Sequence, residues 1–563
     1  MKYSGAAITI NLLERQGIEI IAGIPGGSNL PLYDVLHQSR IRHILTRHEQ
    51  GAGFIAQGMA RSTGRAAVCF ATSGPGATNL LTAIADAHMD SIPLIAITGQ
   101  VPRPMIGTNA FQEVDMLGLT GPITKRNFFV RQARELLEII PEAFRVALSG
   151  RPGPVAIDIP KDVQTEMAEF DLWPDPGVRQ SPGPGDPGVA TKAAEMIRAA
   201  RRPLLYIGGG IIAAECAPAL RSLAEKNSIP AVSTLMGLGV FPHDHPLFLG
   251  MLGMHGARHT NRAMEEADLL LALGVRFDDR AIGRAGEFCR HAAIIHVDID
   301  GAEIGKIKAS NLGLAADAGC FLAQLEPLLD RLQRAGWRAR LATLRENHPL
   351  RLPAETDLRH PAGILRFIAN HLPADTILTT DVGQHQMWTA QAFPFQRPRT
   401  LLTSGGLGTM GFGLPAAIGA ALAHPEKKIV CISGDGSIQM NLQEMATLAE
   451  LDLDITVIIM NNNHLGLVRQ QQELFYNGRY AASRFASSPD FAAIARGYGL
   501  HAVDLAGRPH PGESLVAALT RTGPAIVNAP VDSAANVFPM VPPGGANHEM
   551  IDDVTLDLTG KMG

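Results

Sequence analysis

The stretch that decides the fold is KIVCISGDGSIQMNLQEMATLAELDLDITVIIMNNN, residues 428–463. It contains two short apolar runs, 428–433 and 455–460, separated by a segment with helical periodicity. A strand, loop, helix and strand in this order predict one unit of a parallel α/β sheet. Asp435 and the Asn461–Asn463 run would then lie at the carboxyl ends of neighbouring strands, the edge where such sheets bind ligands.

The same pattern recurs along the chain on both sides of this stretch. Short apolar runs that end in glycine or a polar residue occur at 66–72, 93–99, 203–210, 268–277, 294–300 and 377–383. We therefore expect an α/β fold of three doubly wound parallel-sheet domains. The expected divisions are a first domain at 1–165, a Pro- and Gly-rich linker at 166–189, a central domain at 190–335, a linker helix at 336–358, a third domain at 359–545 and a C-terminal tail at 546–563. TSGPG (72–76) and TSGG (403–406) both precede helices of small residues, which suggests a common architecture for the first and third domains.

Composition excludes several classes of protein. The chain has 563 residues, 46% of them hydrophobic, which is enough apolar surface for real cores and argues against disorder. Basic and acidic side chains nearly balance, 49 against 54, so a nucleic-acid or anionic-membrane partner is not expected. The five cysteines form no CxxC motif, and no signal-peptide core or long apolar run is visible. We expect a cytoplasmic protein.

Asp435 and the asparagine run suggest a metal site. Gly434 and Gly436 flank Asp435 and would let the backbone approach a phosphate, while the following helix offers N–H groups. Mg²⁺ prefers one carboxylate, an amide or backbone oxygen, water and substrate phosphates. The alternative is an ordinary Asp-Gly turn. A GDG motif followed by asparagine 27 residues later, Asn462 here, resembles the signature of thiamine-diphosphate enzymes, which implies Asp435, Asn462 and the carbonyl of His464 as Mg²⁺ ligands.

That resemblance also requires a carboxylate that activates the thiamine ring. Glu49, in RHEQGA (47–52), follows an apolar run and opens a helical pattern, which is where the family carries its glutamate. Hydrogen bonding from such a carboxyl shifts the aminopyrimidine into the tautomer that takes a proton from the reactive carbon. The alternative is a glutamate that only favours a helix N-terminus.

The resemblance extends over the whole chain. The stretches that carry it include GIPGGSNLPLYD, RHEQGAGFIAQGMAR, SGPGATNL, GTNAFQEVD, LGMLGMHG, GVRFDDRAIG, DVGQHQMW and TSGGLGTMGFGLPAA. They resemble the large, catalytic subunits of acetohydroxyacid synthases (acetolactate synthases), especially the bacterial valine-sensitive isozyme. These enzymes decarboxylate pyruvate and join the two-carbon unit to pyruvate or 2-oxobutanoate, on the way to valine, leucine and isoleucine. The resemblance implies thiamine diphosphate, Mg²⁺ and a structural FAD, a homodimer or dimer of dimers with the active site at the subunit interface, and a small regulatory subunit.

The resemblance also assigns residues, position by position. The implied catalytic residues are Glu49, Gln112, Lys125 and Gly27. The implied thiamine diphosphate site is Gly26, Val382, Gly383, Gln384, His385, Gly408, Met410, Gly434, Asp435, Gly436, Ser437, Asn462, His464 and Gly466, with Met410 as the apolar prop that bends the cofactor. The implied FAD site in the central domain is Arg151, Gly208, Gly209, Gly210, Thr234, His255, Gly274, Arg276, Asp278, Arg280, Asp298 and Asp300. The implied acceptor pocket is Phe111, Met254, Arg280 and Gln471.

One position departs from the family. Gln471 stands where many members carry a tryptophan that packs against the extra methyl group of 2-oxobutanoate. Losing one such contact is worth ~1 kcal/mol, so we expect weak discrimination between the two acceptors. Pyruvate oxidase and glyoxylate carboligase have the same architecture and are alternative interpretations. Glyoxylate carboligase lacks the activating glutamate, so Glu49 argues against it. A catalytically silent nucleotide-binding or scaffold subunit is the rival from another class.

Overall fold

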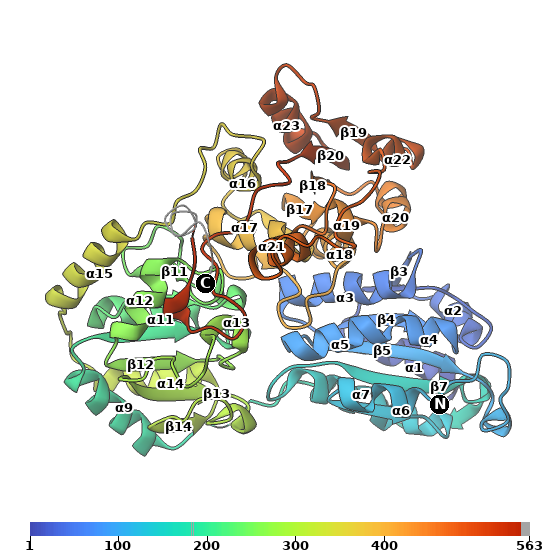
Figure 1. Cartoon of the computed structure of the whole chain (residues 1–563). Helices are drawn as coiled ribbons and strands as arrows, with labels where there is room; N and C mark the ends of the chain where they lie inside the picture. Colours follow the sequence, from blue (N-terminus) through green and yellow to red (C-terminus); the bar gives the residue numbers. More distant parts are fainter. Residues whose placement is uncertain (182, 184, 553–563) are drawn as a thin grey trace.

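Three six-stranded sheets form the framework of the chain (Figure 1). The computed structural model describes residues 1–181, 183 and 185–552. Within each of the three sheets all strand pairs are parallel. Helices lie between consecutive strands in all three units, so the predicted α/β fold of three doubly wound parallel sheets is confirmed.

The first sheet has the strand order β3-β2-β4-β5-β7-β6. Its strands are β2 (Ile20–Gly23), β3 (Arg42–Leu45), β4 (Ala67–Ala71), β5 (Leu94–Gln100), β6 (Arg126–Phe129) and β7 (Val155–Pro160). Its helices are α1 (Gly5–Arg15), α2 (Leu30–Leu36), α3 (Glu49–Thr63), α4 (Pro75–Asn79), α5 (Leu81–Asp90), α6 (Met116–Thr120), α7 (Leu136–Leu148) and α8 (Lys161–Thr165). β1 (Lys2–Ser4) pairs antiparallel with β8 (Met167–Glu169), so this unit continues past the predicted end at 165.

The central sheet has the strand order β11-β10-β9-β12-β13-β14. Its strands are β9 (Pro203–Ile207), β10 (Ala231–Ser233), β11 (Phe248–Met251), β12 (Leu269–Leu273), β13 (Ala293–Asp298) and β14 (Leu312–Ala315). Its helices are α9 (Pro187–Ala199), α10 (Gly209–Ala213), α11 (Ala217–Asn227), α12 (Arg258–Glu266), α13 (Asp279–Ile282) and α14 (Ala318–Leu325). Numbered within the unit, the order is 3-2-1-4-5-6, that of dinucleotide-binding sheets, whose ligands lie where the order reverses. That point falls between β9 and β12.

The third sheet has the strand order β16-β15-β17-β18-β20-β19. Its strands are β15 (Ile377–Thr380), β16 (Leu401–Leu402), β17 (Ile429–Gly434), β18 (Ile455–Asn461), β19 (His501–Asp504) and β20 (Ala525–Pro530). Its helices are α16 (Pro361–Ala369), α17 (Gln384–Ala392), α18 (Gly413–Ala423), α19 (Asp435–Ile438), α20 (Glu444–Leu451), α21 (Gly466–Phe475), α22 (Phe491–Gly497) and α23 (Pro511–Thr520). Within the unit the order is 2-1-3-4-6-5, the same as in the first sheet, as the shared TSG motifs suggested. Ligand-binding edges of this type lie between the first and third strands, here β15 and β17.

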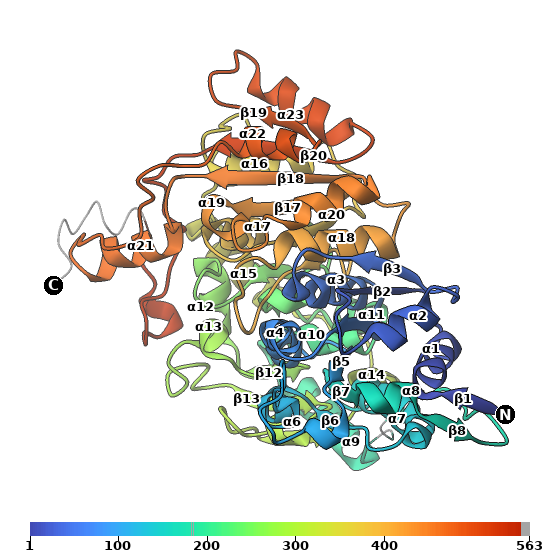
Figure 2. The same ribbon diagram turned by 90° about the vertical axis from the view of Figure 1, so that its right-hand side faces the viewer.

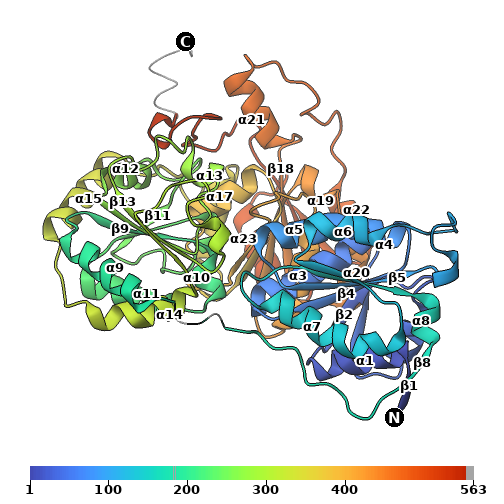
Figure 3. The same ribbon diagram turned by 90° about the horizontal axis from the view of Figure 1, so that it is seen from below.

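Helices α3 and α18 join the first and third units. They lie between the two sheets in Figure 2, and the middle of each helix is buried. Glycines allow the close approach: a Cβ on Gly58 would come within 2.9 Å of the backbone of Ala416, and one on Gly419 would collide with the backbone of Ile55. Seen from below, the first and central units lie side by side (Figure 3). The three sheets therefore meet around a common centre.

Two segments behave differently from simple linkers. α15 (Ala335–Asn347), which falls mostly in the predicted linker helix at 336–358, buries Trp337, Leu341 and Leu344. The chain after β20 returns to the central unit, where Ala546 pairs with Gly283. The predicted tail extends beyond this point, but residues 553–563 lie outside the described part of the chain, as do positions 182 and 184 of the predicted linker. Among the described residues no helix is long and apolar enough to cross a membrane.

Candidate active site

The carboxyl edge of the third sheet carries a buried carboxylate with a free oxygen. β17 ends at Gly434 and α19 begins at Asp435, so the side chain of Asp435 lies at the strand end. Its Oδ2 atom is buried without a hydrogen-bond partner among the described residues. Burial raises the pKa of Asp435 to about 7, although backbone groups of Asn463 and Asn462 partly offset it. A buried carboxylate oxygen that lacks a donor fits a cation, because the bound charge would replace the missing partner.

The other two predicted metal ligands lie beside Asp435. Asn462 follows β18, and its Oδ1 accepts a hydrogen bond from the backbone N–H of His464 at 3.0 Å. The ring Nδ1 of His464 bonds back to the carbonyl of Asn462 at 2.7 Å. This tight turn holds the segment rigidly at the strand end. One carboxylate, one amide and nearby carbonyls match the donor set that Mg²⁺ prefers.

The loop after β15 meets this edge, where the strand order reverses. Ser437 donates a hydrogen bond to the carbonyl of Val382 at 2.9 Å. The amide of Gln384 donates to Gln470 at 2.9 Å. His385 is buried, its Nε2 lacks a partner among the described residues, and burial lowers the pKa of its ring to about 3. A neutral imidazole with an unpaired buried nitrogen is a second polar atom available to a ligand.

Glycines let the segments at this edge pack closely against one another. A Cβ at Gly434 would come within 2.9 Å of the His385 ring, and one at Gly466 would come within 2.7 Å of the Asn462 amide. Gly383 precedes α17 as its N-cap residue. Gly436 lies beside Asp435 in α19. A side chain at Gly434 or Gly466 would therefore displace other residues that the sequence predicts for the diphosphate site.

Met410 lies in a loop that enters the same region. Gly408, two residues before it, has a φ of 71°, a conformation that favours glycine. The backbone N–H groups of Gly411 and Gly413 both donate to the buried carboxylate of Asp381, at 2.8 and 3.0 Å. Met410 itself is half-buried. The loop is thus held firmly on its C-terminal side.

Glu49 belongs to the corresponding edge of the first sheet. It is the first residue of α3, and its Oε2 accepts a hydrogen bond from the Asn79 amide at 2.9 Å. The loops that carry Gly26 and Thr72 lie nearby, and a Cβ on Gly26 would collide with Thr72. A Cβ on Gly76 would lie 3.2 Å from Oε1 of Glu49. No hydrogen bond or ion pair among the described residues joins Glu49 to Asp435 directly.

The four predicted acceptor residues form one pair and two separate positions. Arg280 and Met254 lie together, because an Arg280 guanidinium N–H reaches the Met254 sulfur at 3.7 Å. Phe111 is 87% exposed on a loop of the first unit. Gln112, beside it, has a φ of 63° and packs against Gly74. Gln471 is half-buried on α21 of the third unit.

Lys125 is turned toward its own unit. Its ammonium donates hydrogen bonds to the carbonyls of Val146 and Ser149, the latter at 2.7 Å. Burial, followed by the nearby charges of Arg145 and Arg151, lowers the pKa of Lys125 to about 8. In the single chain the Lys125 ammonium is therefore held by carbonyls of the first unit, close to the charge of Arg151.

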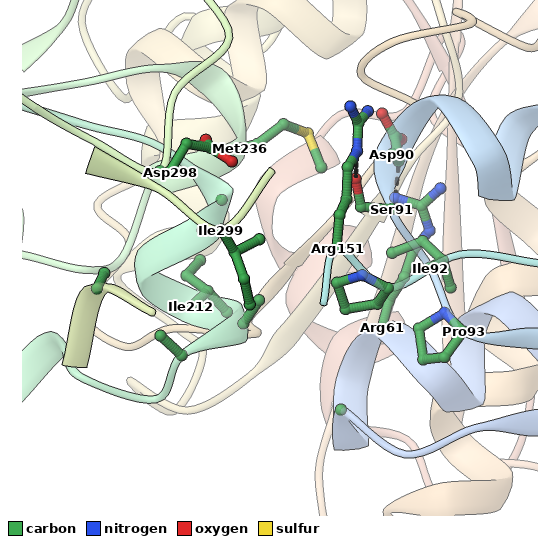
Figure 4. Close-up of a pocket in the computed structure, with 18 of the residues that line it drawn as sticks. Arg61, Asp90, Ser91, Ile92, Pro93, Arg151, Ile212, Met236, Asp298 and Ile299 are labelled. Carbon is green, nitrogen blue, oxygen red and sulfur yellow. Dashed lines mark hydrogen bonds and ion pairs between the residues drawn. The ribbon is translucent and has the colours of Figure 1, made fainter. Parts of the chain in front are cut away.

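A cavity of about 220 Å³ lies where the three units meet, beside the point of order reversal in the central sheet (Figure 4). Half of the predicted flavin residues line it: Arg151, Gly209, Gly210, Gly274, Arg276 and Asp298. Arg151 donates hydrogen bonds to Ser91 of its own unit at 2.8 Å and to Glu303 of the central unit at 2.9 Å. Burial raises the pKa of Asp298 to about 6. An arginine, a strand-end aspartate and close-packed glycines are the groups that a dinucleotide needs.

The other predicted flavin residues lie around or away from this cavity. Thr234 has a buried hydroxyl without a partner among the described residues. Gly208 packs against the backbone of Gly274. Asp278 caps α13 by accepting from the N–H of Ala281. Asp300 lies 3.6 Å from Arg151, and Arg280 belongs to the pair with Met254.

His255 lies in a different place. It lines a second cavity, of about 380 Å³, together with Gln391, whose amide donates to the His255 carbonyl. The ring Nδ1 bonds to the carbonyl of Pro539 at 3.3 Å, and burial lowers the pKa of the ring to about 4. The first cavity is also lined by residues to which the sequence assigned no role, such as Arg61, Asp90 and Met236. They come from distant parts of the chain, so no local pattern indicates that they meet at one cavity.

Comparison with known proteins gives the family. Three family models match: the thiamine pyrophosphate enzyme N-terminal TPP binding domain over residues 3–119, the central domain over 190–325 and the C-terminal TPP binding domain over 381–529. The acetolactate synthase isozyme 1 large subunit of Escherichia coli (strain K12) is 55% identical over 98% of both chains. The isozyme 2 large subunit of the same strain is 44% identical over 98% of this chain and 100% of its own. The acetolactate synthase large subunit of Parasynechococcus marenigrum (strain WH8102) is 46% identical over 97% of this chain and 91% of its own. The chain belongs to the acetolactate synthase large-subunit family of thiamine pyrophosphate enzymes.

Proposed function

We propose that this chain is the catalytic subunit of an acetolactate synthase. It takes pyruvate as donor and pyruvate or 2-oxobutanoate as acceptor, and forms 2-acetolactate or 2-aceto-2-hydroxybutanoate for branched-chain amino acid biosynthesis. The observation that carries the proposal is the unpaired, buried Oδ2 of Asp435 beside Asn462 at the reversal point of the third sheet. A cation and a diphosphate fit this edge, and the family is one of thiamine pyrophosphate enzymes.

Different residues at this edge would bind the metal ion and the diphosphate. Asp435, Asn462 and the carbonyl of His464 would hold Mg²⁺. The backbone around Gly383, Gly434, Gly436 and Gly466, with the Ser437 hydroxyl, would approach the diphosphate. A side chain at Gly434 or Gly466 would displace His385 or Asn462 of the same site. When bound, thiamine diphosphate supplies a carbon nucleophile and an electron sink for decarboxylation of a 2-oxoacid.

Glu49 would hold the proton that activates the cofactor. Its Oε2 is engaged by Asn79, which fixes the carboxyl and directs Oε1 toward Gly76 at the open edge of the first sheet. Around the two edges the single chain exposes apolar side chains, including Phe111 (87%) and Met440 (53%). Such exposure suggests that a second copy covers them. We place Glu49 of one protomer opposite Asp435 of its partner, in a homodimer or dimer of dimers.

The acceptor would be bound from the central unit. Arg280 is exposed and presents a guanidinium fork suited to a carboxylate, with Met254 beside it as an apolar wall. Gln471, Phe111, Gln112, Gly27 and Lys125 complete the proposed set when the copies assemble.

The cavity at the meeting point of the three units is the proposed FAD site. The carboligation needs no redox step, so the flavin would act as a structural ligand. A small regulatory subunit is a further proposed partner, because the relatives are named large subunits. All five cysteines are unpaired, which suits a reducing compartment and the expected cytoplasmic location.

The test is a pyruvate assay on purified protein, with thiamine diphosphate, Mg²⁺ and FAD omitted one at a time. We expect acetolactate as the product, with complete dependence on thiamine diphosphate and Mg²⁺. Acetate and hydrogen peroxide formed under oxygen would replace this proposal with a pyruvate oxidase. A protein that binds the cofactors but forms no product would indicate a silent subunit.

A further inference from the structure

Three charged side chains lie buried between the first and third units, and no role has been given to them in the thiamine diphosphate site. Arg61, on α3, forms ion pairs with Asp86 at 2.8 Å and with Asp90 at 2.9 Å, and both aspartates belong to α5. The aspartate side chains are fully buried and that of Arg61 is 4% exposed. Burying a charge costs on the order of several kcal/mol per ion. Such a cluster therefore requires extensive hydrogen bonding.

Asp90 supplies part of that bonding to a loop of the third unit. Its carboxylate accepts hydrogen bonds from the backbone N–H groups of Gly405, at 2.9 Å, and Gly406, at 2.7 Å. Arg61 donates to the carbonyl of Thr403 at 2.9 Å. Residues 403–409, which we term the anchored loop, are therefore held at their start by groups from the other unit.

Asp86 holds the far part of the anchored loop. Its Oδ2 accepts hydrogen bonds from the hydroxyls of Ser404 and Thr409, the latter at 2.9 Å. The N–H of Thr409 in turn donates to the Ser404 hydroxyl at 2.8 Å. Met410 follows directly, and Asp381 binds the backbone on its other side. Met410 thus lies between two buried carboxylate anchors, one in each unit.

We propose that Arg61, Asp86 and Asp90 are positioning residues that fix the anchored loop, and through it Met410, in the thiamine diphosphate site. The proposal rests on the proposed function, because Met410 shapes the reaction only if the cofactor binds there. None of the three side chains needs to touch the substrate or the cofactor. Their contribution is to define the position of a backbone segment that belongs to a different domain.

The same cluster forms one wall of the cavity assigned to FAD. Arg61 and Asp90 lie on one side of it, with Met236 and Asp298 on the other (Figure 4). The Met236 sulfur occupies the space that a Cβ on Gly405 would need. A ligand in the cavity would therefore lie against Asp90 and Met236, which both contact the anchored loop. A flavin bound in the cavity would thus be physically connected to the thiamine diphosphate site, although it takes no part in electron transfer.

Asp90 and Asp86 accept hydrogen bonds from different kinds of donor, so we expect their asparagine variants to behave differently. All three partners of Asp90 are N–H donors, so the amide of Asp90→Asn must oppose at least one of them. Two partners of Asp86 are hydroxyls, which can rotate and accept instead, so Asp86→Asn is accommodated more easily. Asp162→Asn is the matched control, because Asp162 pairs with Arg103 outside the anchored loop.

The experiment measures three quantities on the full-length variants: hydrogen exchange of peptides covering 401–411, the affinity for thiamine diphosphate with Mg²⁺, and kcat and KM for pyruvate. For Asp90→Asn we expect faster exchange in this segment, and kcat and cofactor affinity each lowered by about tenfold or more, with KM for pyruvate nearly unchanged. Asp86→Asn should show a smaller change, and Asp162→Asn none. If Asp90→Asn does not fold, Thr409→Val replaces it in the test, because this variant removes a single hydroxyl and leaves the charges intact. Thr409→Val should shift all three quantities in the same direction as Asp90→Asn.

A second arm adds FAD. In the wild-type protein FAD should slow exchange of 401–411, and Asp90→Asn should lose most of that protection. Wild-type-like exchange and cofactor affinity in Asp90→Asn, or equal effects in Asp90→Asn and Asp162→Asn, would overturn the proposal. Exchange without FAD reports on the loop even in an inactive protein, so failure of the proposed function, seen as no acetolactate from the wild type, is distinguishable from failure of the anchor.

Discussion

Glu444 provides a sharp test of how the first and third units set the position of Glu49. Its side chain is buried, and its Oε1 accepts hydrogen bonds from the backbone N–H groups of Arg47 and His48, both at 3.0 Å. Its Oε2 accepts from the Thr447 hydroxyl at 2.7 Å. We predict that Glu444→Ala destabilises the protein and displaces the start of α3, whereas Glu444→Gln does so only weakly.

The magnitude follows from the bonds that are lost. A hydrogen bond to a charged acceptor contributes about 1.5–3 kcal/mol, and Glu444→Ala leaves two part-buried backbone donors without their acceptor. Burial raises the pKa of Glu444, which means that part of this gain is offset by the cost of desolvating the carboxylate. We therefore expect a loss of about 3 kcal/mol for Glu444→Ala. Glu444→Gln can keep an oxygen toward both N–H groups and its NH₂ toward Thr447, so about 1 kcal/mol or less is expected.

The measurements are urea unfolding and steady-state kinetics on the two variants. Glu49 directly follows His48, and a small displacement of a catalytic group lowers turnover by up to about a hundredfold. We expect Glu444→Ala to lower kcat at least about tenfold, and Glu444→Gln to remain near wild type. Equal stability and turnover in the two variants would refute the claim that this carboxylate positions Glu49.

Three further predictions concern chemistry, specificity and pH. Glu49→Gln keeps an oxygen for Asn79 and should fold normally, yet lose about 10²–10⁴-fold in kcat while still binding thiamine diphosphate; near-normal turnover would remove Glu49 from its role. With both acceptors at equal concentration the wild type should favour 2-oxobutanoate by less than ~20-fold, and Gln471→Trp should raise that ratio several-fold, as product analysis can check. Burial raises the pKa of Asp158 to about 7. The folded state therefore favours the protonated form, the free energy of unfolding should fall as pH rises from about 4 to 7, and Asp158→Asn should flatten that dependence in urea titrations.

The arrangement of single strands and their ends could be predicted because it depends on local sequence. Asp435 follows an apolar run and precedes a helix, and a parallel strand that ends there must deliver its side chain to the sheet edge. Glu49 similarly opens α3 directly after a strand and a short turn. The expected helix after GDG is in fact divided into α19 and α20, so the first N–H groups come from α19, which starts at Asp435 itself.

Strand order could not be predicted in the same way. The central sheet has the order of dinucleotide-binding sheets, although Gly208-Gly209-Gly210 lacks their usual glycine spacing. Order depends on where each crossover leads, which is a property of packing between distant segments. The fact that the first and third sheets share one order was only suggested by the TSG motifs.

Contacts between the units could not be predicted from local sequence either, because they too depend on packing between distant segments. Glu444 meets Arg47 and Asp90 meets Gly405 across hundreds of residues, and the local sequence around each residue does not indicate its partner. His255 was assigned to the flavin by resemblance, yet it faces a cavity separate from that lined by Arg151. Which residues surround a cavity at a domain junction is decided by how the domains dock.

The most direct test of the shared active site is complementation between two inactive variants. Glu49→Gln and Asp435→Asn would be purified separately, shown to be inactive, and then mixed under conditions that exchange subunits. If Glu49 of one protomer serves Asp435 of its partner, each mixed dimer regains one intact site, and random equimolar mixing should restore about a quarter of wild-type activity. No recovery of activity, with exchange verified by differently tagged subunits, would place both residues in a site within one chain and contradict the account.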